Sequence, residues 1–150
     1  MSSKTEVNAL LRNDLTLFIE RTFRHLNPGT EYMSNWHIQA IAYALERCHL
    51  GECKRLIITM PPRYLKSISV TVAFSAWQLG HDPACSIIAA SYAQELATWH
   101  HNDTRKVMES PWYRSCFPMT HIDPKKNTQS DFRTSKNGGR FATSVGGTLT

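Results

Sequence analysis

The sequence lacks the segments that carry proteins into or across membranes. No run of about eighteen uninterrupted apolar residues occurs, so a membrane-spanning helix of ordinary length is excluded. Charged residues interrupt every apolar stretch of the amino terminus, MSSKTEVNALLRNDLTLF, which therefore has no secretion-signal core. We accordingly expect a cytoplasmic protein with no membrane partner.

Paired cysteines and metal-binding histidine motifs are lacking as well. The four cysteines are Cys48, Cys53, Cys85 and Cys116, with no CxxC pair among them, and we interpret them as reduced thiols. A zinc site built from Cys48, His49, Cys53, His100 and His101 is the less favoured alternative, because this spacing fits no common zinc pattern. The seven histidines contain no HExxH motif, so a histidine-built metal site is not expected.

Length and composition indicate one folded unit. The chain has 150 residues, 41% of them hydrophobic and 19% charged, which is typical of a globular domain. Seventeen Lys and Arg residues against twelve Asp and Glu residues give a formal charge of +5. This balance is compatible with a polyanionic partner, although many proteins with no such partner share it.

Apolar periodicity predicts two helices in the first third of the chain. Apolar residues recur at three- and four-residue steps over residues 11–26, which predicts an amphipathic helix ending near Asn27-Pro28-Gly29. A second helix is predicted over residues 36–50, with Ser34 or Asn35 as its cap and Gly51 as its stop.

The middle of the chain predicts a βαβ unit. Residues 54–60 (KRLIITM) and 84–90 (ACSIIAA) are short apolar runs of the kind found in strands covered on both faces. A helix predicted over residues 66–79, ended by Gly80, lies between them, so the two strands should be parallel.

After this unit we expect a helix over residues 92–108 and a short turn-rich piece, SPWYRSCFP. Residues 119–130 are polar and unpatterned, which indicates a surface loop. The segment DFRTSKNGGRFATSV places two alternating runs around Asn137-Gly138-Gly139, which predicts a β-hairpin.

The loop MPPRYLKS, residues 60–67, has the layout of a phosphate-binding loop. Such a loop directs backbone N–H groups and a helix amino terminus at anionic oxygens, and it ends in a lysine followed by a hydroxyl residue. Lys66 and Ser67 hold those two positions. The usual glycines are replaced by Met60 and Leu65, and leucine makes a positive φ costly. A surface turn with an exposed lysine is the alternative.

The chain contains five short motifs in this order: WHIQAI, PPRYLKS, SYAQELA, SPWYR and FATSVGGTLT. Together they resemble the ATPase domain of the phage terminase large subunit, the motor that packages viral DNA. In that family the phosphate loop is commonly PPR-x-x-KS, and one branch carries leucine before the lysine. The resemblance covers residues 36–150. It implies an α/β fold of the P-loop NTPase type, a parallel sheet flanked by helices and incomplete at the carboxyl terminus. An N-terminal helical segment over residues 1–30 would precede a partial ATPase domain over residues 31–150.

The resemblance implies ATP and Mg²⁺ as cofactors. The nucleotide-binding residues in the loop would be Pro62, Arg63, Tyr64, Leu65, Lys66 and Ser67. Lys66 would bind the β- and γ-phosphates and Ser67 would ligate the Mg²⁺ ion, against the alternative of a solvated lysine. Arg63 is a candidate phosphate sensor or an ordinary surface arginine, and Pro61 and Pro62 would pre-set the loop dihedrals.

Trp36 and Gln39 are candidate adenine contacts. They are three residues apart and therefore share one helix face, and the Gln39 amide matches the N6/N7 edge of adenine. The family uses an upstream glutamine in this way. The alternative places Trp36 in the core and Gln39 on the helix surface.

Three further groups are candidate DNA contacts or carry family motifs. Ser91 and Tyr92 follow the second predicted strand, where related motors approach nucleic acid, although Tyr92 could equally be packing. The basic run RTSKNGGR, with Lys125 and Lys126, could contact a DNA backbone or be solvated surface. Thr143 and Ser144 belong to a family motif to which we assign no chemical role.

No apolar run of the sequence ends in Asp-Asp or Asp-Glu, the acidic strand end that hydrolysis needs. In the family this acidic strand lies beyond the VGG-x-LT segment, and a nuclease domain follows. We therefore expect the first part of a motor, encoded by a fragment of a prophage gene. Whole motors of this family form homo-oligomeric rings on double-stranded viral DNA, with a terminase small subunit and a portal protein, in the host cytoplasm. The alternatives are a catalytically silent remnant that only binds ATP or DNA, and a small-molecule kinase, which Gln39 and SYAQELA disfavour.

Overall fold

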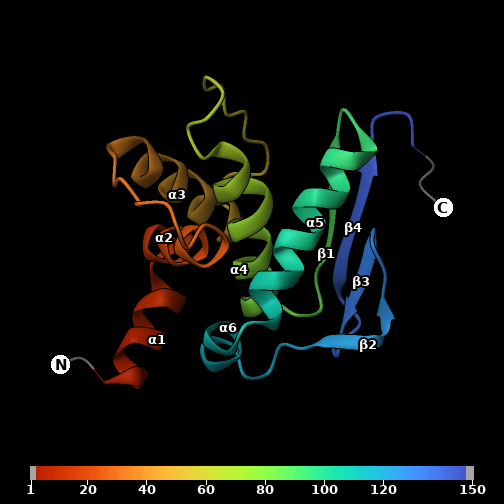
Figure 1. Cartoon of the computed structure of the whole chain (residues 1–150). Helices are drawn as coiled ribbons and strands as arrows, with labels where there is room; N and C mark the ends of the chain where they lie inside the picture. The colour runs from red at the N-terminus through yellow and green to blue at the C-terminus, as the bar shows by residue number, and fades with distance from the viewer. Residues whose placement is uncertain (1–2, 148–150) are drawn as a thin grey trace.

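The computed structural model describes residues 3–147 (Figure 1). Met1, Ser2, Thr148, Leu149 and Thr150 lie outside the described residues, so the end of the FATSVGGTLT motif is not placed. Within residues 3–147 the element order is three helices, a longer helix with a π-helical segment, then one strand, two helices and three strands.

Two helices form the amino-terminal part where one was predicted. α1 (Lys4–Asn13) begins with a capping box, in which the Glu6 N–H donates to Ser3 Oγ (3.2 Å) and the Ser3 N–H donates to Glu6 Oε2 (2.7 Å). α2 (Leu15–Leu26) is capped by Asp14, whose carboxylate accepts the Leu17 N–H (3.2 Å). The prediction of a single helix over residues 11–26 is wrong because the extended backbone of Asp14 ends one helix and caps the next.

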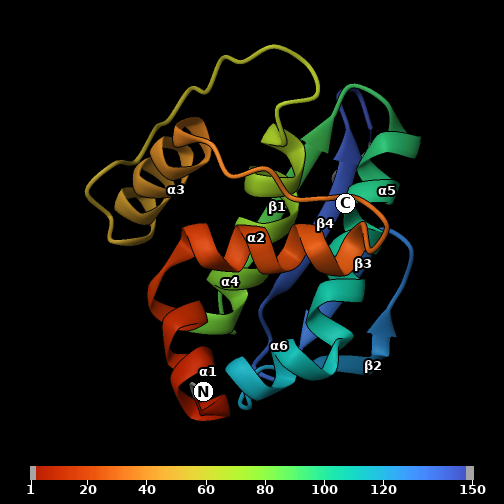
Figure 2. The same cartoon turned by 60° about the vertical axis from the view of Figure 1, so that its left-hand side comes forward.

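α3 (Trp36–His49) matches the second predicted helix, and Gly51 follows it with a φ of +78°. The chain then runs in an extended path that arches over one end of the molecule (Figure 2). The predicted strand over residues 54–60 is absent from the described structure, and Ile57 is 89% exposed. A strand exists only where a neighbour accepts its backbone hydrogen bonds, and within residues 3–147 this segment pairs with no strand.

The helix that follows the loop covers residues 66–81 and is not uniformly α-helical. Its second turn, Ile68–Ala73, is π-helical, and α4 (Phe74–His81) completes it. The Phe74 N–H donates to the Ser69 carbonyl, a spacing of five residues. Gly80 lies inside this helix rather than ending it, and a Cβ at Gly80 would come within 2.6 Å of the Phe117 ring. Close packing therefore accounts for Gly80.

Four strands form one mixed sheet in the order β1-β4-β3-β2. They are β1 (Ser86–Ser91), β2 (Ile122–Asn127), β3 (Asp131–Thr134) and β4 (Gly139–Ser144). Only β1 and β4 are parallel, with Ser86 opposite Gly139 and Ser91 opposite Ser144, and the other two pairings are antiparallel. The predicted parallel sheet is therefore corrected to a mixed one, whereas an α/β fold with a sheet flanked by helices is confirmed.

The predicted hairpin is confirmed as β3 and β4, and Asn137 in its turn adopts a φ of +66°. Two other predictions fail. SPWYRSCFP contains α6 (Pro111–Cys116), capped by Ser110 with Pro111 at the first helical position. The expected loop over residues 119–130 contains β2, an edge strand held by β3 rather than by its own apolar pattern.

α5 (Gln94–Glu109) lies between the sheet and the other helices (Figure 1). The molecule is therefore layered: the other helices form the first layer, α5 the second and the sheet the third. The core is continuous between these layers and includes Phe18, Ile38, Val72, Leu79, Tyr113 and Phe132. None of the helices in residues 3–147 combines the length and hydropathy needed to cross a bilayer.

Candidate functional site

The loop over residues 60–67 lies at the end of the molecule where the parallel strands finish. β1 and β4 both point toward this end, and the loop passes over it between the extended segment and the helix (Figures 1 and 2). Ligands of α/β sheets commonly bind beyond the carboxyl ends of parallel strands. The loop thus occupies the position where such a ligand would be held.

The sign of the backbone dihedral φ alternates along the loop. Arg63 has a φ of +69° and Leu65 a φ of +60°, while Tyr64 between them is not left-handed. The left-handed region costs a non-glycine residue about 1–2 kcal/mol, so two such residues in three positions require compensation. Leu65 packs against the core, which supplies part of it. Leucine thus occupies the conformation for which a glycine was expected.

Successive residues of alternating backbone hand can present a concave row of N–H groups that binds anions. Within residues 3–147, the N–H groups of Arg63, Tyr64 and Leu65 donate to no protein acceptor. The first hydrogen bond of the following helix runs from the Ser69 N–H to the Leu65 carbonyl (2.9 Å). The N–H groups ahead of Ser69 are therefore the free donors of a helix amino terminus.

The loop encloses a cavity of about 540 Å³. Its lining residues are Met60, Pro61, Pro62, Arg63, Leu65, Lys66, Ser67 and Ile68. Arg63 and Ser67 are exposed and Lys66 is partly exposed, so their polar groups are accessible. Apart from Tyr64, the loop residues expected to contact a nucleotide meet around one cavity.

The first turn of α3 approaches the loop through aromatic rings. The His37 and Tyr64 ring centroids are 5.5 Å apart at 74°, and the Trp36 and His37 centroids are 6.4 Å apart at 89°. Trp36 is 76% exposed and Gln39 is also exposed, so the alternative that placed Trp36 in the core is wrong. The sequence analysis did not single out His37, although its position beside Trp36 was a signal.

The carboxyl ends of the two parallel strands carry hydroxyl residues. Ser91 lies opposite Ser144, and the Val145 N–H donates to the Ser91 carbonyl (2.9 Å). Tyr92 is 83% exposed, so the core-packing alternative for its ring is wrong. Thr143 is buried beside them, with its hydroxyl 3.4 Å from the Ser144 carbonyl oxygen. This group faces the same end of the molecule as the loop.

Arg140 belongs to the basic run RTSKNGGR, for which surface exposure is predicted, but its side chain is buried against α5. Its Nη1 lies 3.1 Å from His101 Nδ1, and its Nη2 donates to the Thr71 carbonyl (3.3 Å) in the π-helical segment. Burial lowers the pKa of Arg140 to about 10, and burial followed by Arg140 and Arg105 lowers the pKa of His101 to about 4. A neutral His101 can accept a hydrogen bond at Nδ1 from the Arg140 guanidinium, which keeps its charge.

Three of the other basic residues, Lys125, Lys126 and Arg133, gather around one hollow on β2 and β3. Lys125, Lys126, Thr128, Asp131, Arg133 and Asn137 line a hollow of about 430 Å³. Asp131 partly offsets this charge, because its carboxylate lies 3.6 Å from Arg133 Nε. Within the described residues, Lys125 and Lys126 form no ion pair with a carboxylate, so this surface keeps their positive charge.

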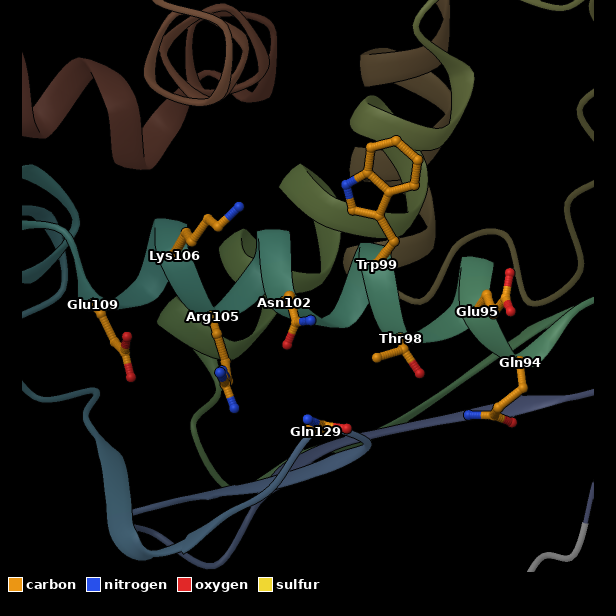
Figure 3. A pocket seen from close by; sticks show the side chains of 9 residues that line it. All are labelled: Gln94, Glu95, Thr98, Trp99, Asn102, Arg105, Lys106, Glu109 and Gln129. Carbon is orange, nitrogen blue, oxygen red and sulfur yellow. The ribbon is translucent and has the colours of Figure 1, made fainter.

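A larger groove, of about 690 Å³, runs along α5 beside the β2–β3 turn and away from the loop (Figure 3). Gln94, Thr98, Asn102, Arg105 and Glu109 point toward the hairpin, where Gln129 lies, while Trp99 and Lys106 point to the other side of the helix. Arg105 Nη1 already donates to Asn127 Oδ1 (3.1 Å) and to the Thr128 carbonyl (2.9 Å). These contacts join α5 to the hairpin.

The residues of the considered zinc site do not all meet: Cys48 and Cys53 lie close together, whereas His49 and His101 face other partners. All four cysteines are free thiols. His49 faces Gln78, with Nδ1 2.7 Å from Oε1, and His101 faces Arg140. Among residues 3–147 no three His, Cys, Asp or Glu side chains are grouped closely enough to hold a metal ion.

Comparison with protein-family models, curated proteins and solved structures finds no match to this chain. Any inference of function therefore depends on the sequence of this chain and on the geometry of its residues.

Proposed function

We propose that this chain binds Mg²⁺-ATP through the loop over residues 60–67, as the nucleotide-binding part of a terminase-type DNA-packaging motor. The observation that carries the proposal is the left-handed backbone at Arg63 and Leu65, which leaves consecutive N–H groups free around a cavity. Strained, non-glycine backbone of this kind persists where a site requires it. The terminase assignment is a further step that depends on the sequence resemblance alone.

Each loop group has a role that its chemistry allows. The free N–H groups would hold phosphate oxygens, and the Lys66 ammonium would add a charge-assisted contact to the β- and γ-phosphates. The exposed Ser67 hydroxyl lies on the cavity and fits one position on Mg²⁺, an ion that usually keeps several waters and needs few protein ligands. Arg63, also exposed at the cavity, would sense the terminal phosphate.

The adenine base would lie toward the first turn of α3. Gln39 offers one donor and one acceptor to the N6/N7 edge, and Trp36 offers an exposed ring beside it. Both side chains are open to solvent and near the helix end that contacts the loop through His37 and Tyr64.

The first test is calorimetric titration with Mg²⁺-ATP. Lys66→Ala should weaken binding by about 1.5–3 kcal/mol because a hydrogen bond to a charged group is lost. Lys54→Ala is the matched control, since Lys54 is an exposed lysine outside the cavity lining. Equal affinity of the wild type and Lys66→Ala would refute the phosphate site.

The base contact has its own test. Gln39→Ala should reduce the preference for ATP over GTP in a competition experiment, because the adenine edge loses its paired donor and acceptor. An unchanged ratio would return Gln39 to the ordinary helix surface.

A second candidate function, binding of double-stranded DNA, is favoured by the grouping of Lys125, Lys126 and Arg133 on one hairpin surface. Phosphate contacts make binding salt-dependent, and each removed cation lowers the slope of log K against log salt by about 1. For binding to duplex DNA, we expect Lys125→Ala and Lys126→Ala each to lower this slope by about 1. Lys4→Ala, on α1, should leave the slope unchanged. Unchanged slopes would assign the two lysines to solvated surface.

A further inference from the structure

The side chain of Tyr64 is directed differently from those of its neighbours in the loop. Tyr64 lies between the two left-handed residues, Arg63 and Leu65, but it is not among the residues that line the cavity. Its ring instead meets the His37 ring edge to face, with centroids 5.5 Å apart at 74°. Tyr64 is thus oriented toward α3 and away from the proposed phosphates.

His37 is presented by a firmly packed helix. Ile38, Ile41 and Leu45 of α3 are buried in the core, and the Ile38 N–H donates to the Asn35 carbonyl (3.1 Å) at the start of the helix. The loop, by contrast, makes no backbone hydrogen bond through the N–H groups of residues 63–65 in the described structure. A side-chain contact from a rigid helix can therefore restrain a backbone that lacks its own hydrogen bonds.

We propose that His37 is a positioning residue that holds Tyr64, and through it the alternating backbone of residues 63–65, in the conformation that presents free N–H groups. The proposal rests on the proposed function, because it assigns His37 a part in the same phosphate site. An edge-to-face aromatic pair contributes beyond its buried area, and its loss would let the loop relax from its left-handed residues. His37 would act without touching the ligand.

Two ligands separate this role from a base contact. Mg²⁺-pyrophosphate carries no base, so a residue that shapes the phosphate loop should affect it as much as Mg²⁺-ATP. We expect His37→Ala and Tyr64→Ala each to weaken both ligands by about two- to tenfold. The double variant should be no weaker than either single one, because both remove the same contact.

His37→Phe is the rescue variant, because it keeps a ring that can meet Tyr64, and it should retain near wild-type affinity. His121→Ala is the matched control, an exposed histidine that directly precedes β2. Additive effects of His37→Ala and Tyr64→Ala, or an effect on Mg²⁺-ATP alone, would overturn the positioning role.

A ligand-free measurement makes the proposal independent of nucleotide. Trypsin cleaves after arginine, and Arg63 is exposed immediately before Tyr64. Cleavage after Arg63, followed by mass spectrometry, should be several-fold faster in His37→Ala than in the wild type, His37→Phe or His121→Ala. Equal rates would refute the restraint. If the wild type binds neither ligand, the proposed function fails, and the cleavage rates alone decide whether His37 holds the loop.

Discussion

At the scale of single residues, the contact between buried Arg140 and His101 depends on the protonation state of the imidazole. A guanidinium has only donors, so the 3.1 Å contact between Arg140 Nη1 and His101 Nδ1 requires a neutral imidazole with its proton on Nε2. Burial is the cause that lowers the pKa of Arg140, and no carboxylate forms an ion pair with it within residues 3–147. The pair therefore depends on His101 remaining uncharged.

We predict that acid destabilises the protein through His101. Its pKa is about 4 in the folded chain and 6.5 in the unfolded chain, so between these values only the unfolded state takes up the proton. The contribution of His101 to the free energy of unfolding is fully present above pH 6.5 and is lost as the pH falls toward 4. The total loss is on the order of 3 kcal/mol. Urea unfolding at pH 7 and pH 5 measures the loss.

His101→Gln supplies the comparison for this prediction, since the glutamine carbonyl can still accept from Arg140 but cannot titrate. Burial also lowers the pKa values of His81 and His100, and their contributions remain in both proteins. A shallower pH dependence in His101→Gln is therefore expected, and identical slopes would contradict the assignment.

At the scale of elements, the loop and its helix form one unit. The π-helical segment directly follows Ser67, and its Thr71 carbonyl accepts both the Ser75 hydroxyl (2.8 Å) and Arg140 Nη2 (3.3 Å). Arg140 lies on β4, so the helix that would carry Lys66 is tied to the sheet at its second turn. Such π-helical turns are often found near functional sites.

We predict that two substitutions at Leu65 differ in their effect on phosphate binding. Leu65→Gly should keep the affinity for Mg²⁺-ATP, because glycine adopts a φ of +60° freely, although it loses the packing of the leucine side chain. Leu65→Val should weaken binding about fivefold, since a β-branched residue is least tolerant of the left-handed region.

Calorimetric titration measures both Leu65 variants, with circular dichroism to confirm that each one folds. Equal affinities for Leu65→Gly and Leu65→Val would mean that the left-handed backbone is not what binds the phosphates.

At the scale of the whole molecule, one end of the parallel strands carries hydroxyl groups where hydrolysis would need a carboxylate. Ser91 and Ser144 end β1 and β4, and among residues 3–147 no acidic residue ends either of these strands. β1 is also the edge of the described sheet, and its Ile88 is 64% exposed. An edge of this kind favours self-association.

We therefore predict that the chain of residues 1–150 binds Mg²⁺-ATP but does not turn it over at an appreciable rate. Lys66 and Ser67 can hold phosphates, but no strand-end carboxylate orients the attacking water. A phosphate-release assay with Lys66→Ala as control measures this. Turnover that Lys66→Ala abolishes would contradict the prediction.

Local patterns predicted the elements whose stability is local. The cap and stop residues Asn35 and Gly51 located α3, and Asn137-Gly138-Gly139 located the β3–β4 turn, because these signals act between residues a few positions apart. The order of residues in MPPRYLKS also placed Lys66 and Ser67 at the start of a helix. Periodicity did not reveal the break at Asp14, since one polar residue changes an apolar stripe very little.

Contacts between distant segments decided the rest. Residues 54–60 have the composition of a strand and still remain unpaired in the described structure, whereas the polar residues 122–127 form a strand because β3 lies beside them. The sequence predicts an exposed Arg140, because it lies in a basic run. Only the packing of α5 against β4 buries its side chain beside His101. Strand pairing and burial depend on which neighbour is present, and a single sequence carries no direct record of that neighbour. The sequence by itself thus determined α3, α5, the hairpin turn and the placement of Lys66 and Ser67 at a helix start, because these depend on neighbours along the chain. The tertiary structure decided the sheet order and the contact of His37 with Tyr64, because these depend on segments far apart in the sequence.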